Sequence, residues 1–160
     1  MPRKTCAVSS TKASVWRSRR YHCTGGAVSG ELGIGLLIKT LAITGGPGEL
    51  ADAARLQRAH LRGAADDDIG AVTAYMRSRD AAALRQAIEA PMRAARAAVA
   101  GLELCAKASG TVKSSLTADL GAAQALLGGA LRAILICIDA NLHHRTSSTG
   151  RGRTSIRGNG

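Results

Sequence analysis

The sequence predicts an all-α fold: an antiparallel bundle of about four long helices with basic, disordered tails. Apolar residues recur at helical spacing, and no segment shows the alternation that is typical of a β-strand. The 160 residues are enough for one domain with a core, yet the chain has no Phe and aromatics are only 2% of it. A core of Ala and Leu needs elements that approach closely, and helices do this better than sheets.

The first two expected helices are separated by a stretch rich in Gly and Pro. Apolar residues within 25–46 suit a short helix, and the stretch 45–48 breaks it. The segment 49–79 is again helical but mostly polar. Near its end we expect Ile69 and Val72 to face the core.

Two longer helices complete the predicted bundle. Asp80 is a plausible N-cap for a helix over 81–109, and Pro91 inside it should kink the helix because it removes a backbone hydrogen bond. A Ser or Thr within 114–117 can cap the last helix, which runs to about residue 142. One tight apolar stripe follows the 3.6-residue period of this helix: Leu120, Leu127, Leu131, Ile134 and Ile138.

The formal charge of +11 belongs to the two ends of the chain. Residues 1–30 and 143–160 hold ten of the 22 Lys and Arg and no acid, which leaves 12 basic residues against 11 acidic ones between them. We therefore expect a basic disordered tail over 1–24, a folded domain over 25–142 and a second basic tail over 143–160. Such tails can attract nucleic acid without sequence specificity, although few aromatics are available for base stacking.

The four cysteines match neither a zinc site nor a disulfide framework, because none of them forms a C-x-x-C pair. Cys105 and Cys137 lie in apolar helical runs and are expected to be small core residues. We expect no metal and a reduced, cytoplasmic protein. The N-terminal composition also resembles that of a mitochondrial transit peptide, whereas no signal-peptide apolar region is present.

Charged residues interrupt both long apolar runs, so we expect no membrane span. Lys39 interrupts the first run and Arg132 the last. In the last helix Asp119, Arg132, Asp139 and Asn141 border the apolar stripe. From the residues alone, Asp119 suits the positive end of the helix dipole, and Arg132 can extend to solvent or pair with an acid.

The segment 119–142, DLGAAQALLGGALRAILICIDANL, resembles the last motif block of the formiminotetrahydrofolate cyclodeaminase and methenyltetrahydrofolate cyclohydrolase family. That block reads roughly S-D-x-G-V-A, then an Ala- and Leu-rich helix with A-L-R, then N-V-x-I-N-L. Five residues match it without a gap: Asp119, Gly121, Arg132, Asn141 and Leu142.

Three further blocks follow the family's order over residues 25–142. GGAVSGELG at 25–33 weakly resembles P-G-G-G-S/A, and ADDD at 65–68 resembles A-D-x-D. EAPM at 89–92 resembles E-V-P-L, which also accounts for a proline inside a helix. The resemblance implies a helical, dimeric fold and reactions on the one-carbon unit that bridges N5 and N10 of tetrahydrofolate.

These reactions need a base that moves a proton and offsets a positive charge, and donors for the folate carboxylates. They need no cofactor beyond the tetrahydrofolate substrate. The resemblance makes Asp119 the first choice for the catalytic carboxylate, and Asp68 or Asp66 the second. Substrate-binding candidates are Gly25, Gly26, Gly30, Arg132 and Asn141.

Structural explanations remain open for most of these residues. Asp66 and Asp68 can belong to a solvated acidic patch, Arg132 can pair with a structural acid, and Asn141 can cap the helix end. The glycines can form a flexible linker.

Two other functions stay open beside the folate enzyme, which we expect to be a homodimer. The lysines that usually follow the family's first helix are absent and the Gly-rich block is altered, which favours a non-catalytic helical oligomerisation module. The basic tails favour a nucleic-acid-associated protein.

Overall fold

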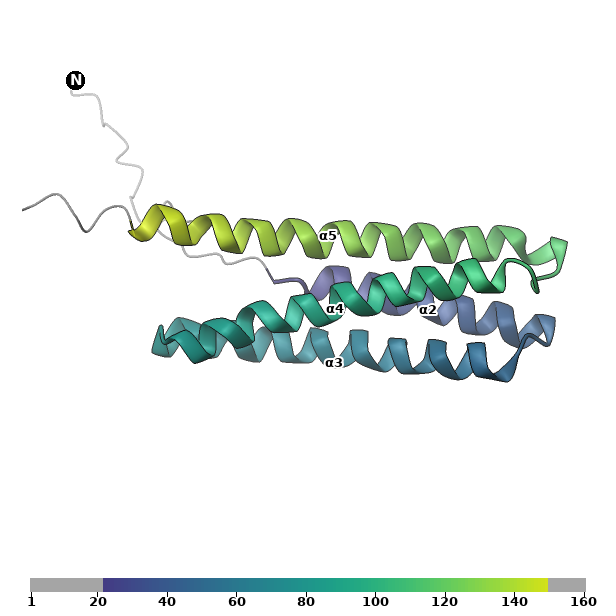
Figure 1. Ribbon diagram of the computed structural model, residues 1–160, viewed down its shortest axis with the longest axis horizontal. Helices are drawn as coiled ribbons and strands as arrows, with labels where there is room; N and C mark the ends of the chain where they lie inside the picture. The colour runs from purple at the N-terminus through teal and green to yellow at the C-terminus, as the bar shows by residue number, and fades with distance from the viewer. Residues whose placement is uncertain (1–21, 150–160) are drawn as a thin grey trace, which may run out of the picture.

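The computed structural model describes residues 22–149; the segments 1–21 and 150–160, which hold most of both predicted tails, lie outside the description. Within 22–149 the chain forms four α-helices, one short 3-10 helix and no strand, which confirms the all-α prediction. The helices lie side by side, and neighbours around the bundle follow the order α5, α2, α3, α4 (Figure 1). Their bounds are Thr24–Thr44 for α2, Gly48–Ser78 for α3, Ala81–Ala108 for α4, Ser114–Leu116 for η1 and Thr117–Thr149 for α5.

The boundaries of the folded part differ from the expected ones at both ends. α2 has 21 residues and is not short. The fold already includes Cys23, which is buried, so the expected boundary at residue 25 lies too late. At the other end α5 continues to Thr149, seven residues beyond the expected limit of 142.

Two helix ends lie at residue types that favour such ends, Asp80 and Gly45. Asp80 caps α4, and its Oδ1 accepts a hydrogen bond of 2.7 Å from the backbone N–H of Ala83, which lowers the pKa of Asp80 below its usual value. Gly45 ends α2 with a left-handed φ of 67°, a conformation that Gly adopts without steric cost. α4 continues through Pro91 as one helix.

The predicted apolar stripe of α5 faces the core. Leu120, Leu127 and Ile134 are buried, while Leu131 and Ile138 are partly buried against the core. Ala123 and Ala130 are also buried and extend the stripe on one side.

The register of α3 corrects one expectation. Val72 is buried as expected, but Ile69 is 52% exposed, and the core position beside it is taken by Asp68, which is 1% exposed. Asp68 lies seven residues after the buried Leu61 and therefore on the same face of α3. Ile69 is the next residue along the helix, so its side chain points away from that face.

Glycines allow α2 to lie very close to α5. A Cβ atom on Gly26 would be 2.7 Å from Ile134 Cγ1 and 3.1 Å from the Ala130 carbonyl oxygen. A Cβ on Gly33 would be 3.1 Å from the Ala123 carbonyl oxygen. The two backbones are thus in contact along much of α2, as a core without large aromatics requires.

By length and composition alone, α2 and α5 are each apolar enough to cross a membrane. The apolar window of α2 is 44% buried inside the bundle, and that of α5, over 114–140, is 22% buried. Core helices of water-soluble proteins share these properties, so the finding is weak evidence for a membrane span.

We expect the Gly26→Ala variant to lower the free energy of unfolding by about 1–3 kcal/mol, because the added methyl group meets backbone atoms that cannot move aside cheaply. Gly63→Ala is the matched control. A Cβ at Gly63, exposed on α3, has nothing within 4 Å, so this change should stabilise the protein by about 0.5–1 kcal/mol through helix propensity. Denaturant unfolding of both variants measures this, and equal effects would contradict the close packing of α2 on α5.

Candidate functional site

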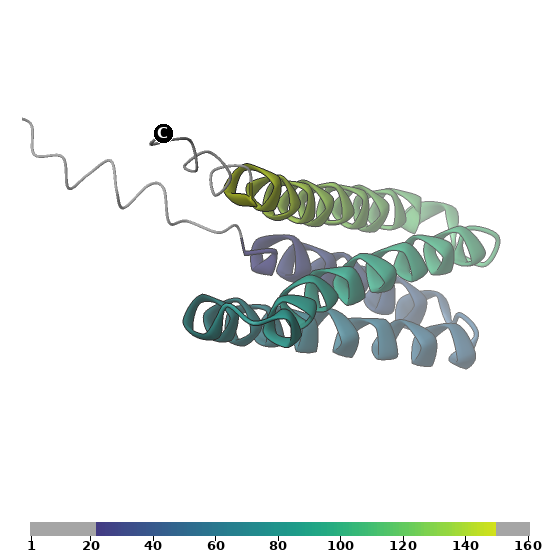
Figure 2. The same cartoon turned by 60° about the vertical axis from the view of Figure 1, so that its left-hand side comes forward.

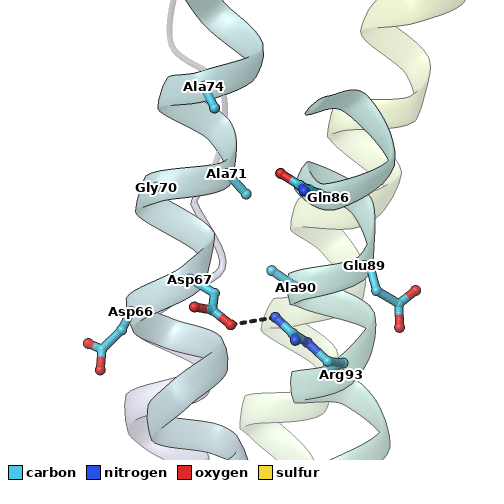
Figure 3. Close-up of a pocket in the computed structure, with 9 residues that line it drawn as sticks. All are labelled: Asp66, Asp67, Gly70, Ala71, Ala74, Gln86, Glu89, Ala90 and Arg93. Atoms are coloured by element: carbon cyan, nitrogen blue, oxygen red, sulfur yellow. Dashed lines mark hydrogen bonds and ion pairs between the residues drawn. The ribbon is translucent and has the colours of Figure 1, made fainter. Parts of the chain in front are cut away.

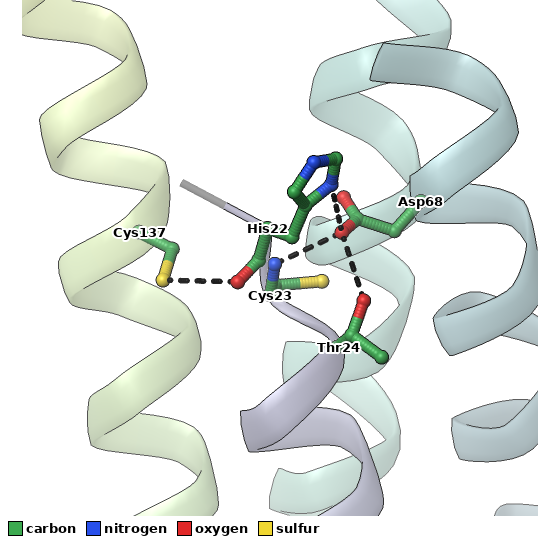
Figure 4. Close-up of polar contacts among 5 residues, drawn as sticks. All are labelled: His22, Cys23, Thr24, Asp68 and Cys137. Atoms are coloured by element: carbon green, nitrogen blue, oxygen red, sulfur yellow. Dashed lines mark hydrogen bonds and ion pairs between the residues drawn. The ribbon is translucent and has the colours of Figure 1, made fainter. Parts of the chain in front are cut away.

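Asp68 on α3 is a buried carboxylate at the N-terminal end of α2. Its Oδ2 accepts a 2.9 Å hydrogen bond from the backbone N–H of Cys23 and lies 3.4 Å from the donating hydroxyl of Thr24 (Figure 4). The first N–H groups of a helix have no partner within the helix, and the helix dipole favours a negative charge there. Asp68 and the start of α2 therefore satisfy each other inside the bundle.

His22 connects this buried carboxylate to solvent. Its Nδ1 lies 3.5 Å from Asp68 Oδ2, and its side chain is 44% exposed. The other ring nitrogen points away from Asp68 (Figure 4). The backbone carbonyl of His22 accepts a long hydrogen bond, 3.6 Å, from the Cys137 thiol of α5, so α5 also holds this residue. A carboxylate that orients an imidazole with one free nitrogen is suited to acid–base chemistry.

The second polar cluster lies in a groove between α3 and α4 with a volume of about 480 Å³. Here the ADDD and EAPM blocks of the sequence meet, because Asp67 and Glu89 come from opposite sides of the groove (Figure 3). Arg93 pairs with Asp67 at 2.6 Å, and Arg96 pairs with Glu89 at 2.7 Å. The Arg93–Asp67 pair joins α3 to α4, whereas the Arg96–Glu89 pair lies within α4. Both pairs are exposed, and they balance the charge of two carboxylates that line the groove.

The structure separates the expected carboxylates. Asp68 faces the interior, which excludes the solvated patch for this residue, while Asp66 is exposed and points away from α4 (Figure 3). Asp119 lies in the first turn of α5. It is 18 residues before Cys137, the α5 residue beside His22, and therefore ~27 Å along the helix from it. A single chain does not bring Asp119 and Asp68 to one substrate.

The glycine candidates are divided between solvent and core. Gly25 is exposed in the first turn of α2. Gly26 and Gly30 are buried against α5, where Ala130 faces both. The linker interpretation is wrong for all three, because they lie within a helix. Gly25 remains the one of the three that can offer its backbone to a ligand.

The last two candidates lie on α5. Arg132 is exposed on the outer side of the helix, in a shallow hollow that also includes Asp139. Asn141 lies within α5, eight residues before its end, so it does not cap that helix; its side chain lies outside the description.

His22 carries no sequence signal for acid–base chemistry. It is 46 residues from Asp68 and stands in a segment with no regular period, so no local spacing joins the two. His22 and Cys23 are adjacent, but two potential ligands do not make a metal site. Within 22–149, no group of three or more His, Cys, Asp or Glu is placed to hold a metal ion.

The three cysteines of the described part of the chain are free, and each has a raised pKa. Burial, followed by the negative charge of Asp68, raises the pKa of Cys23 to about 12, and burial raises that of Cys105 to about 11. Burial and Asp68 also raise the pKa of Cys137. All three are therefore protonated near neutral pH and are poor nucleophiles.

Fold and site together define a helical bundle whose candidate centre is a carboxylate–imidazole pair at the start of a helix. The chain belongs to the formiminotransferase-cyclodeaminase family, whose model matches residues 18–151 of the 160. This confirms the resemblance and links the chain to folate one-carbon metabolism. No curated protein and no solved structure matches it.

The raised thiol pKa values predict a loss of stability in alkali. The Cys105 thiol titrates near 9.0 when unfolded and near 11 when folded, so between these values the unfolded state loses a proton that the folded state keeps. The free energy of unfolding should fall with pH in this window, by at most ~1.4 kcal/mol per pH unit for this thiol.

Cys105→Ala tests this prediction, because the variant lacks the thiol and should have a shallower slope than the parent chain above pH 9. Denaturant unfolding at several pH values measures the two slopes. Parallel slopes would show that Cys105 ionises equally in both states.

Proposed function

We propose that this chain binds a tetrahydrofolate derivative with a one-carbon unit at N5 or N10 and acts on that unit as a cyclohydrolase or a cyclodeaminase. His22 serves as the acid–base group and Asp68 positions it. The observation that supports this proposal is the contact between the buried Asp68 carboxylate and the partly exposed His22 imidazole at the N-terminus of α2. Family membership supplies the substrate class.

In the cyclohydrolase direction water attacks the carbon of the methenyl cation. The outer nitrogen of His22 takes the proton of this water while the C–O bond forms. Asp68 stabilises the imidazolium that results, because its charge is buried and already oriented. The imidazolium then returns the proton to N5 as the C–N5 bond breaks, and the hydroxyl of the tetrahedral intermediate loses its proton to solvent as the C=O bond of the 10-formyl product forms.

In the cyclodeaminase direction His22 acts on the formimino derivative of tetrahydrofolate. N10 attacks the carbon of the protonated formimino group, which closes the ring, and gives up its proton to His22. This proton passes to the departing nitrogen, which leaves as ammonia as the C–N bond breaks and the methenyl cation forms. Neither direction calls for a metal or a redox cofactor, so the proposal includes no cofactor beyond the substrate.

The buried carboxylate also matches the charge of the reacting group. The methenyl unit is an amidinium-like cation, and Asp68 contributes a negative charge at the start of α2. Gly25 is exposed in the same first turn of α2, beside the buried Gly26. A cytoplasmic location, where free thiols stay reduced, is part of the proposal.

Purified full-length chain should accelerate the loss of methenyl-tetrahydrofolate absorbance, or its appearance from the formimino substrate. We expect His22→Gln to lower kcat/KM by about 10²–10⁴-fold, because it removes the proton acceptor and keeps a polar side chain. Asp68→Asn should also lower it, since the amide holds the imidazole less well and carries no charge. His60→Gln, the same change at an exposed position of α3, is the control.

The Asp119→Asn variant distinguishes this proposal from the assignment that the sequence favoured. Loss of activity in Asp119→Asn, with full activity in His22→Gln, would move the chemistry to the start of α5. A parent chain that accelerates neither reaction would favour the non-catalytic helical module. Far-UV circular dichroism of each variant establishes that the bundle is intact.

A further inference from the structure

His22 lies outside regular secondary structure, so contacts with other elements decide its position. It precedes Cys23, the N-cap of α2, and the hydrogen bonds of that helix therefore do not fix its backbone. The start of α2 lies between α5 and the α3–α4 pair, short of the end of the bundle (Figures 1 and 2). On either side α3 continues beyond Asp68 and α5 continues beyond Cys137. These neighbouring helices are placed to hold His22.

Cys137 of α5 holds the backbone of His22. Its thiol donates a hydrogen bond of 3.6 Å to the His22 carbonyl oxygen (Figure 4). Burial and the charge of Asp68 raise the pKa of this thiol, so it keeps its proton and remains a donor near neutral pH. Cys137 thus connects the imidazole-bearing residue directly to a long, packed helix.

Thr24 acts on the other member of the pair, the carboxylate. Its hydroxyl donates to Asp68 Oδ2 over 3.4 Å, and the same oxygen lies 3.5 Å from His22 Nδ1. The backbone N–H of Cys23 adds a hydrogen bond of 2.9 Å to this oxygen. Two donors at the start of α2 therefore fix the carboxylate oxygen that faces the imidazole.

We propose that Cys137 and Thr24 are positioning residues for the His22–Asp68 pair. Cys137 fixes the imidazole from α5, and Thr24 fixes the carboxylate from α2, so each member of the pair is held by a different helix. A catalytic group must be held within about 0.5 Å of its working position, and a displacement of about 1 Å can lower a rate ~100-fold. This inference rests on the acid–base role that we propose for His22.

Steady-state kinetics of the full chain test the role of Cys137. Cys137→Ala removes the donor and should lower kcat by ~10-fold with KM nearly unchanged, because substrate still binds while the imidazole is displaced. Cys137→Ser keeps a donor and should retain most of the parent kcat. Cys105→Ala, the same change in the core near the end of α4, is the matched control and should leave kcat unchanged. Equal losses in the Ala and Ser variants, or no loss in either, would contradict the role.

The same measurement tests Thr24. Thr24→Val removes the hydroxyl and keeps the shape of the side chain, so it should lower kcat by a similar factor, whereas Thr24→Ser should not. Thr40→Val is the matched control, because Thr40 is buried in α2 and its hydroxyl has no hydrogen-bond partner among the described residues. The double variant Cys137→Ala/Thr24→Val should lose less than the product of the two single losses, since both residues serve one contact. A full product would show that they act separately.

Backbone 15N relaxation of His22 tests the hold without any turnover. We expect an order parameter of ~0.85 in the parent chain and in Cys137→Ser, and one below ~0.6 in Cys137→Ala. An inactive parent chain that shows this difference would refute the proposed reaction while supporting the hold of α5 on His22. An order parameter that Cys137→Ala leaves unchanged would overturn the inference, whether or not the chain is active.

Discussion

The close approach of α2 to α5 is the constraint on which the rest of the bundle depends. A core without Phe has little volume to bury per side chain, so its helices must touch nearly backbone to backbone. Gly26 and Gly33 provide that contact between α2 and α5, and α4 adds Gly101, whose Cβ would collide with Ile34 and Leu127. Glycine lowers the helix propensity at these positions, but the close packing that it allows stabilises the fold by more than this loss.

The same contact positions the candidate site. Because α2 is held against α5, its first turn meets both the Cys137 side of α5 and the Asp68 side of α3. A buried carboxylate is costly unless donors surround it, and the start of a helix supplies such donors without a cation. Asp68 can therefore stay inside the bundle while one edge of the cluster, His22, reaches solvent.

The sequence was sufficient for much of the fold because the relevant signals are local. Gly45 and Pro47 separate α2 from α3, Asp80 caps α4, and the apolar stripe of α5 has a clear period. The candidate site could be predicted from the sequence less well than the fold. Asp68 appeared in a motif, but its burial depends on the register of α3 against α2, and His22 reaches it only through the tertiary fold. The prediction that Ile69 is buried was wrong for the same reason. In a run of small and acidic residues, hydrophobicity alone poorly predicts which face of the helix is buried.

Three polar residues of α5 have different surroundings. Asp119 stabilises the start of the helix through its dipole, at the end of the bundle away from His22. Arg132 and Asp139 belong to the outer face, where they line a shallow hollow together with Leu135 and Ile136. The two faces of α5 differ in what surrounds them. The inner face packs on the glycines of α2, whereas the outer one contributes glycines of its own. The three glycines of α5 offset part of the high helix propensity of its Ala and Leu residues, so the packing of its inner face on α2 and α4 contributes to the stability of the helix.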